Sequence, residues 1–322
     1  MTMGPVTMRI EAPPAYFVHV PKTGGRTLGE VLDRVYRPRQ RIRLNFVNMA
    51  RLPLDQLSRF RFYHAMHQGR SLFELIGRPE LLLFTMLREP VERAVSDLLY
   101  FQRTVREVPQ SFMPEFLEQA RPLLACDLSA PLDEDAFRRT FSPQVSTLGI
   151  RLDYRPLFQG GPDVASGRTL LRPYPLPPLM DVADRAAILA NALRWLEEFH
   201  VVGITEQYER SLRLICDQLG IAMPAAIPQI NANPARITER SDYARRLPQR
   251  VYDQLNALTA DDRVLYREGL ARFEAQWARF EARPQRLYSF GPRLRLGVAE
   301  SFPVRLAKKL RRRLRKRGHH GH

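Results

Sequence analysis

Short continuous apolar runs alternate along this chain with longer segments in which apolar residues recur at helical spacing. Continuous runs of about four to eight apolar residues are typical of strands buried on both faces, whereas recurrence every three or four residues predicts amphipathic helices. The runs that predict strands are Tyr16–Val20, Ile42–Val47, Phe60–His64, Leu81–Leu87 and Val201–Ile204. The segments that predict helices include Thr27–Tyr36, Ser71–Ile76, Val91–Gln102, Asp181–Glu198, Gln207–Leu219, Arg250–Leu258 and Asp262–Phe280. This alternation predicts an α/β fold with a central parallel sheet flanked by helices.

A glycine-containing turn follows the first expected strand. Its residues are Pro21, Lys22, Thr23, Gly24, Gly25, Arg26 and Thr27. A strand, a glycine turn and a helix in this order can bind phosphate, because glycine lets the backbone approach an anion and the helix N-terminus presents unpaired N–H groups. Lys22 adds a positive charge, and Thr23 and Thr27 add hydroxyl donors. A Walker A loop has its lysine after the last glycine, where this chain has Arg26, so an ordinary P-loop NTPase is disfavoured.

A second segment that could bind phosphate follows the fourth expected strand. Arg88 comes directly after the apolar run Leu81–Leu87, and Pro90 suits the first turn of a helix. Ser96 is expected on the side of this helix that faces its entrance. We therefore expect Arg88 and Ser96 to bind one anion at the carboxyl end of a strand.

These two segments together resemble motifs of sulfotransferases that use 3'-phosphoadenosine 5'-phosphosulfate (PAPS), in the carbohydrate branch that contains heparan sulfate 2-O-sulfotransferase and bacterial sulfotransferase family 2 proteins. In that family a Pro-Lys-Thr-(Gly/Ala)-(Gly/Ser)-Thr-(Ser/Thr) loop holds the 5'-phosphosulfate, and an Arg-(Asp/Glu)-Pro-x-x-Arg-x-x-Ser segment holds the 3'-phosphate. Arg26 departs from the usual threonine. The resemblance implies a P-loop-like sulfotransferase fold, PAPS as co-substrate without a metal, and transfer of a sulfuryl group to a carbohydrate hydroxyl.

This reaction needs a cation at the leaving phosphate and a base that takes the acceptor proton. Lys22 is the expected cation. The family carries a Phe-Tyr-His-Gly-His segment whose second histidine is the base, and here one extra residue separates His64 from His67. His64 shares strand parity with Phe60 and Phe62 and is expected to be buried, whereas His67 lies beyond the strand end. We therefore favour His67 as the general base and keep His64 as the alternative.

Length and charge predict a main domain and a basic appendage. The 322 residues carry a net charge of +16, and nine Lys or Arg residues lie between residues 303 and 322. We expect a sulfotransferase domain over residues 1–282 and an extension over residues 283–322. Leu306, Leu310 and Leu314 recur within the basic run, so this extension is either an amphipathic helix that binds an anionic membrane surface or a disordered tail. No nucleic-acid reader motif accompanies it, so nucleic acid is not an expected partner.

The cysteines and the N-terminal segment bear on metal binding and on location in the cell. Cys126 and Cys216 are far apart and give no metal-ligand spacing. No apolar segment near the N-terminus resembles a signal peptide or membrane anchor, so we expect a cytoplasmic enzyme that acts at most peripherally at a membrane. Two alternatives stay open, a nucleotide-phosphate kinase on a related fold and a non-catalytic anion-binding protein.

Overall fold

The computed structural model describes residues 11–44, 52–66, 69–112, 114–141, 143–155, 184–227 and 243–283. His67 and residues 284–322 of the basic extension therefore lie outside the described residues. The described chain divides into two compact units. The first takes its residues from Met1–Glu89, Pro143–Ile227 and Asp261–Phe290, and the second from Pro90–Ser142 and Pro228–Ala260.

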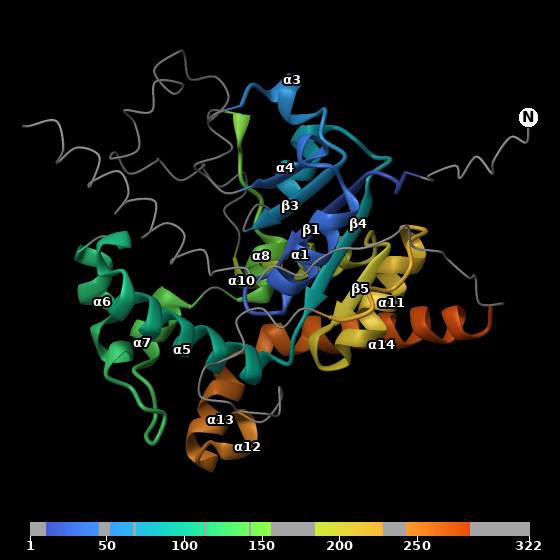
Figure 1. Ribbon diagram of the computed structural model, residues 1–322. Coiled ribbons are helices and arrows are strands. Elements are labelled where there is room, and N and C mark those ends of the chain that lie inside the picture. The colour runs from blue at the N-terminus through green and yellow to red at the C-terminus, as the bar shows by residue number, and fades with distance from the viewer. Residues whose placement is uncertain are drawn as a thin grey trace, which may run out of the picture. The chain divides into compact units, whose positions relative to one another are not determined.

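The first unit is built on a sheet of five parallel strands (Figure 1). The strands are β1 (Ala15–His19), β2 (Arg41–Leu44), β3 (Phe62–Met66), β4 (Leu82–Leu87) and β5 (Val201–Ile204). Their order across the sheet is β2-β3-β1-β4-β5. All five strands overlap the apolar runs of the sequence, and the predicted α/β fold with a parallel sheet is confirmed.

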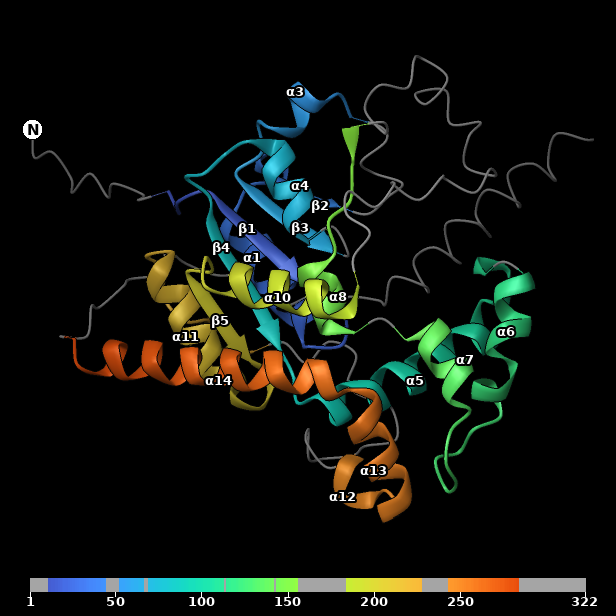
Figure 2. The ribbon, with the colours of Figure 1, turned by 180° about the vertical axis from the view of Figure 1, so that it is seen from behind.

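Helices cover both faces of this sheet. Helices α1 (Gly25–Val35) and α11 (Tyr208–Gln218) lie on the face that is turned to the viewer in Figure 1. Helices α4 (Gly69–Ile76), α8 (Gln144–Gly149), α10 (Arg185–Leu196) and α14 (Ala260–Glu281) lie on the opposite face, which Figure 2 shows in front. Shorter helical segments are η1 (Pro38–Gln40), α3 (Leu54–Leu57) and η5 (Thr205–Gln207). Strands β1, β3, β4 and β5 are almost entirely buried for this reason, which explains their apolar sequences. The edge strand β2 instead alternates arginine with apolar residues and leaves Arg43 exposed.

The strand order creates a switch point between β1 and β4. The chain leaves β1 toward β2 and β3 on one side, and it leaves β4 toward β5 on the other side. In open α/β sheets, ligands bind outside the carboxyl ends of the strands at such a point. The glycine turn follows β1 and Arg88 follows β4, so both expected phosphate-binding segments meet here.

The outer edge of β5 is closed by side chains. Gln276 of α14 accepts a hydrogen bond from the N–H of Val202 at 3.3 Å and donates one to the carbonyl of His200 at 2.9 Å. The hydroxyl of Ser211, on α11, accepts from the N–H of Ile204 at 2.8 Å. These side chains supply the hydrogen bonds that a sixth strand would otherwise supply.

The second unit is helical. It contains α5 (Pro90–Glu107), η2 (Pro109–Ser111), α6 (Pro114–Leu124), α7 (Glu134–Thr140), α12 (Tyr243–Arg246) and α13 (Gln249–Leu258). Its buried core includes Val91, Val95 and Leu98, three positions of α5 at helical spacing. Among the described helices, none is long and apolar enough to cross a bilayer.

Candidate functional site

The turn after β1 has an unusual backbone. Lys22 and Gly24 both have left-handed dihedral angles, with φ values of 68° and 77°. Thr23 lies fully buried between them and donates its hydroxyl to the carbonyl of Val20 at 2.8 Å. A left-handed conformation costs a residue with a Cβ atom roughly 1–2 kcal/mol, so Lys22 is held in place by its surroundings.

Helix α1 begins directly after this turn with an N-terminus suited to an anion. Gly24 occupies the N-cap position, so the N-cap residue has no side chain that could accept from the first turn. The first turn also lacks an acidic residue. In α1 the N–H of Thr27 donates to the carbonyl of Gly24 at 3.0 Å, and the N–H groups that precede it, like those at the start of any helix, favour negative charge. Arg26 and Thr27 belong to this turn, Arg26 half-buried and Thr27 buried.

Arg88 reaches the turn from the end of β4. Its side chain is 8% exposed, and its Nη1 atom donates to the carbonyl of Lys22 at 3.3 Å. The backbone of Arg88 is fixed by Gln144, which accepts from its N–H at 3.0 Å and donates to its carbonyl at 2.9 Å. Asp262 in turn accepts from the N–H groups of Gln144 and Val145 at 3.0 and 2.9 Å. The Arg88 guanidinium and the turn therefore lie together, as the sequence predicts.

The end of β5 joins the ends of β1 and β4. The hydroxyl of Thr205 lies 2.9 Å from the carbonyls of both Thr23 and Leu87. Thr205 is the first residue of η5 and is not an N-cap, because the N-cap residues of η5 and α11 are Ile204 and Gln207. Its hydroxyl connects the segment that follows β5 to the glycine turn and to the end of β4.

Glu206 holds the backbone of Glu89, the residue that follows Arg88. Its carboxylate accepts from the N–H of Glu89 at 3.0 Å and from the hydroxyl of Tyr266 at 3.1 Å. Burial and the neighbouring Glu206 carboxylate raise the pKa of Tyr266 well above its ordinary value, so this hydroxyl stays a donor. Like Thr205, Glu206 belongs to η5, and its contacts to the residues after β4 are not revealed by any local sequence pattern.

His64 is buried beneath α1. It is 3% exposed, as its strand parity predicts, and its Nε2 atom lies 2.8 Å from Nδ1 of His19. Burial, followed by the charges of His19, Arg43 and Arg26, lowers the pKa of His64 well below 6.5. A neutral imidazole is therefore expected at physiological pH. His67, the favoured base, is outside the described residues, so the choice between the two histidines stays a prediction.

Ser96 belongs to the other unit. It lies on α5 and is half-buried, whereas Arg88 belongs to the unit that contains the sheet. The expected joint binding of one anion by Arg88 and Ser96 therefore stays a prediction.

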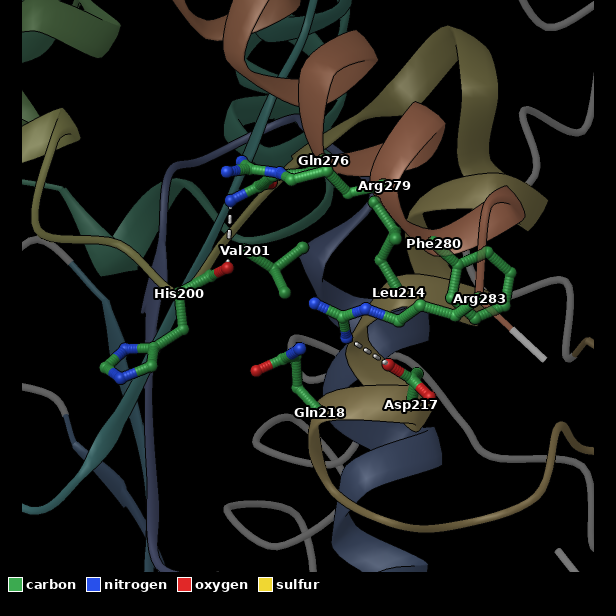
Figure 3. Close-up of a pocket in the computed structure, with 9 residues that line it drawn as sticks. All are labelled: His200, Val201, Leu214, Asp217, Gln218, Gln276, Arg279, Phe280 and Arg283. Carbon is green, nitrogen blue, oxygen red and sulfur yellow. Dashed lines mark hydrogen bonds and ion pairs between the residues drawn. The ribbon is translucent and has the colours of Figure 1, made fainter. Parts of the chain in front are cut away.

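A small cavity of about 150 Å³ opens at the other end of β5 (Figure 3). It is lined by His200, Val201, Leu214, Asp217, Gln218, Gln276, Arg279, Phe280 and Arg283. The His200 ring points away from the arginines in Figure 3, and its Nδ1 atom accepts from the N–H of Leu83 at 3.1 Å. Because this cavity lies at the amino end of the strand, it is separate from the glycine turn of residues 21–27.

No family model matches the chain, and no curated protein shows significant sequence similarity to it. Among solved structures, a sulfotransferase from Alicyclobacillus acidocaldarius is similar over 83% of this chain and 99% of its own, with a TM-score of 0.39 and 16% identity. The functional assignment therefore depends on the residues of the site.

The ends of β1 and β4 bring together groups that favour an anion. The uncapped N-terminus of α1, the Lys22 side chain and the Arg88 guanidinium belong to adjoining segments of the same unit. Within the described residues, no group of three His, Cys, Asp or Glu side chains could hold a metal ion.

Proposed function

We propose that this protein is a sulfotransferase that moves the sulfuryl group of PAPS to a hydroxyl of a carbohydrate. The observation that carries the proposal is the contact between Arg88 and the Lys22 carbonyl at the uncapped N-terminus of α1. This contact joins the two segments that resemble the phosphosulfate and 3'-phosphate motifs. The turn of residues 21–27 would hold the 5'-phosphosulfate, and Arg88 with Ser96 would hold the 3'-phosphate.

In the proposed reaction the acceptor oxygen attacks sulfur while the bond between sulfur and the phosphate oxygen breaks. His67 would take the acceptor proton, and adenosine 3',5'-bisphosphate would leave with the electron pair. Lys22 and the N–H groups of the first turn of α1 would stabilise the negative charge that develops on the leaving phosphate. Positioning and electrostatics dominate group transfers of this kind.

Transfer of labelled sulfate from PAPS to a panel of glycans tests the proposal directly. We expect label in at least one glycan, and binding of adenosine 3',5'-bisphosphate that is tighter than binding of ATP in isothermal titration. Tighter ATP binding with phosphate transfer would instead identify a kinase. Bisphosphate binding without transfer to any acceptor hydroxyl would indicate a non-catalytic anion-binding protein.

The role of Arg88 is tested by nucleotide preference. Charge-assisted hydrogen bonds to a 3'-phosphate should make adenosine 3',5'-bisphosphate bind far more tightly than AMP. Arg88→Ala should remove most of this preference. Arg59→Ala is the control, because Arg59 is an exposed arginine that pairs with Asp55 on α3. Equal affinities of the unmodified protein for the two nucleotides would contradict the assignment.

The base is tested by His67→Ala. A general base acts on the acceptor and not on the nucleotide, so this variant should keep bisphosphate binding and lose turnover by roughly a hundredfold to ten-thousandfold. Full activity of the folded variant would exclude His67 as the base.

A further inference from the structure

Two buried histidines form a hydrogen-bonded pair behind the phosphate-binding turn. His19 is the last residue of β1, and His64 lies on the neighbouring strand β3. Both side chains are 3% exposed, and the ring centroids are 4.9 Å apart. The 2.8 Å separation of His64 Nε2 and His19 Nδ1 requires that one of these nitrogens donates and the other accepts.

Helix α1 rests directly on these two rings. A Cβ atom at Gly25 would lie 2.1 Å from Cδ2 and 2.4 Å from Nε2 of His19. One turn further, a Cβ atom at Gly29 would lie 2.4 Å from Cε1 of His64. The rings therefore set how closely α1 approaches the sheet, and His19 contacts the residue at which the helix begins.

The surroundings of His64 determine where the protons lie. Its Nδ1 atom is buried and has no hydrogen-bond partner in the described part of the chain. A proton on Nδ1 would be a buried N–H donor without an acceptor, which costs more free energy than an unprotonated ring nitrogen at the same place. The proton of neutral His64 therefore belongs on Nε2. Nε2 then donates to Nδ1 of His19, which leaves the proton of His19 on its own Nε2, against Gly25.

The charged groups around the pair favour this neutral form. The cations Arg26 on α1 and Arg43 on β2 disfavour a further positive charge on His64. Glu30 and Asp33 of α1 both pair with Arg43, so their charges are balanced locally. His64 therefore stays neutral, with its single proton on Nε2.

We propose that His19 and His64 are a positioning pair, in which His64 orients the His19 ring and that ring fixes the first turn of α1 for anion binding. His64 then acts through His19 and is not the general base. This inference rests on the proposed function. It adds a role for both histidines, which the residues of the proposed binding site alone do not show.

The test compares His64→Gln with His64→Leu. The terminal amide nitrogen of glutamine can replace imidazole Nε2 as a donor, whereas leucine has no donor. We expect His64→Leu to weaken binding of adenosine 3',5'-bisphosphate about threefold to tenfold, the effect of one hydrogen bond, with a parallel loss of sulfate transfer. His64→Gln should restore most of both, and Arg59→Ala serves as the surface control.

A base would behave differently, because an amide cannot take a proton. If His64 is the base, His64→Gln binds bisphosphate normally and loses turnover by about a hundredfold or more, which would overturn the inference. Wild-type affinity in His64→Leu would overturn it as well. If the unmodified protein binds no bisphosphate, the proposed function itself fails, and the two failures are distinguishable.

A second variant covers the case in which His64→Leu does not fold. His19→Asn keeps an acceptor close to the position of imidazole Nδ1, but it removes the ring edge that contacts Gly25. Thermal unfolding should show a folded protein, and bisphosphate binding should weaken about threefold to tenfold despite the retained hydrogen bond. Unchanged affinity of the folded variant would contradict the positioning role.

Discussion

Lys22 combines a charge that the proposed reaction uses with a backbone conformation that lysine adopts unfavourably. Its φ of 68° is typical of glycine, and it lies between the half-buried Pro21 and the buried Thr23. Strain of this kind is stored where a site requires a particular geometry. Stability and function therefore make opposite demands on this residue.

Substitution of Lys22 should separate these demands. Lys22→Ala should lower turnover by about a hundredfold or more, the scale of losing one preorganised electrostatic group, with a smaller effect on cofactor binding. Lys22→Gly should lose turnover to the same extent as Lys22→Ala. Its unfolding free energy should be higher than that of Lys22→Ala by up to about 1 kcal/mol, because glycine relieves the left-handed strain. Urea unfolding and sulfate transfer measure the two effects. A Lys22→Gly variant no more stable than Lys22→Ala would contradict the strain.

Gly29 should tolerate no side chain. Gly29→Ala would place a methyl group within 2.4 Å of the His64 ring, so the helix or the ring must move. We expect a loss of roughly 1–3 kcal/mol in unfolding free energy, although alanine is otherwise the better helix residue. Gly220→Ala is the comparison, because a Cβ atom there contacts nothing within 4 Å and its left-handed φ of 63° alone should cost roughly 1–2 kcal/mol, so it shows backbone strain without a steric contact. An unaltered unfolding midpoint for Gly29→Ala would show that the contact is loose.

Residue by residue, the sequence predicts what is local. The parity of β3 predicts the burial of His64, and the order of strand and turn places Lys22 and Arg88 at one edge of the sheet. The partnership of His64 with His19 is not predictable in this way, because 45 residues separate them and the register of β1 with β3 is not encoded in either strand alone. The same holds for Gln144 and Asp262, which are 118 residues apart.

At the scale of elements, apolar patterning finds strands more reliably than short helices. Helices α6, α7 and α8 are absent from the prediction. Helix α6 contains Pro122 and buries only Ala120 and Leu123, so its apolar stripe is weak. Helix α7 does carry a readable signal, because the Asp133 carboxylate caps it by accepting from the N–H of Ala136 at 2.8 Å.

Thr205 offers a test of how the strand ends cooperate. Thr205→Val keeps the shape of the side chain but leaves the carbonyls of Thr23 and Leu87 without this hydroxyl. We expect unfolding free energy to fall by about 1–3 kcal/mol, and bisphosphate affinity to fall with it, because the glycine turn loses its hydrogen bond to the segment that follows β5. Thr205→Ser retains the hydroxyl and should be close to the unmodified protein in both measurements. Equal unfolding free energies and equal bisphosphate affinities of Thr205→Val and Thr205→Ser would show that the hydroxyl does not stabilise the turn.

At the scale of the whole molecule, stability should depend on pH through His64. Its pKa in the folded protein is well below 6.5, the ordinary value that applies on unfolding. Below about pH 6.5 the unfolded chain therefore binds more protons than the folded protein, so stability falls as pH falls until the folded-state pKa is reached. The slope from one such group is at most about 1.4 kcal/mol per pH unit.

Urea unfolding between about pH 7.5 and pH 5 measures this dependence. His64→Gln should flatten the curve, because glutamine does not titrate. His200 has a lowered pKa of its own, from burial and the charge of Arg272, so a weaker slope should survive in the variant. An unchanged slope in His64→Gln would mean that other groups control the acid response.

The division of the described residues into two units could not be predicted from the apolar pattern of the sequence. The second unit joins residues from Pro90–Ser142 with residues from Pro228–Ala260. Composition does not reveal which distant segments pack together, since its core pairs α5 with α13 across more than a hundred residues. The parallel sheet is predictable because each of its strands carries its own local signal.

The amide of Gln276 also bears on how copies of this protein behave when crowded. An open strand edge is a template on which another chain can add a strand, and such additions lead to aggregation. Here α14 supplies one side chain that occupies both the N–H of Val202 and the carbonyl of His200. The helix that covers the sheet thus also protects it against growth at this edge, at the cost of a single glutamine.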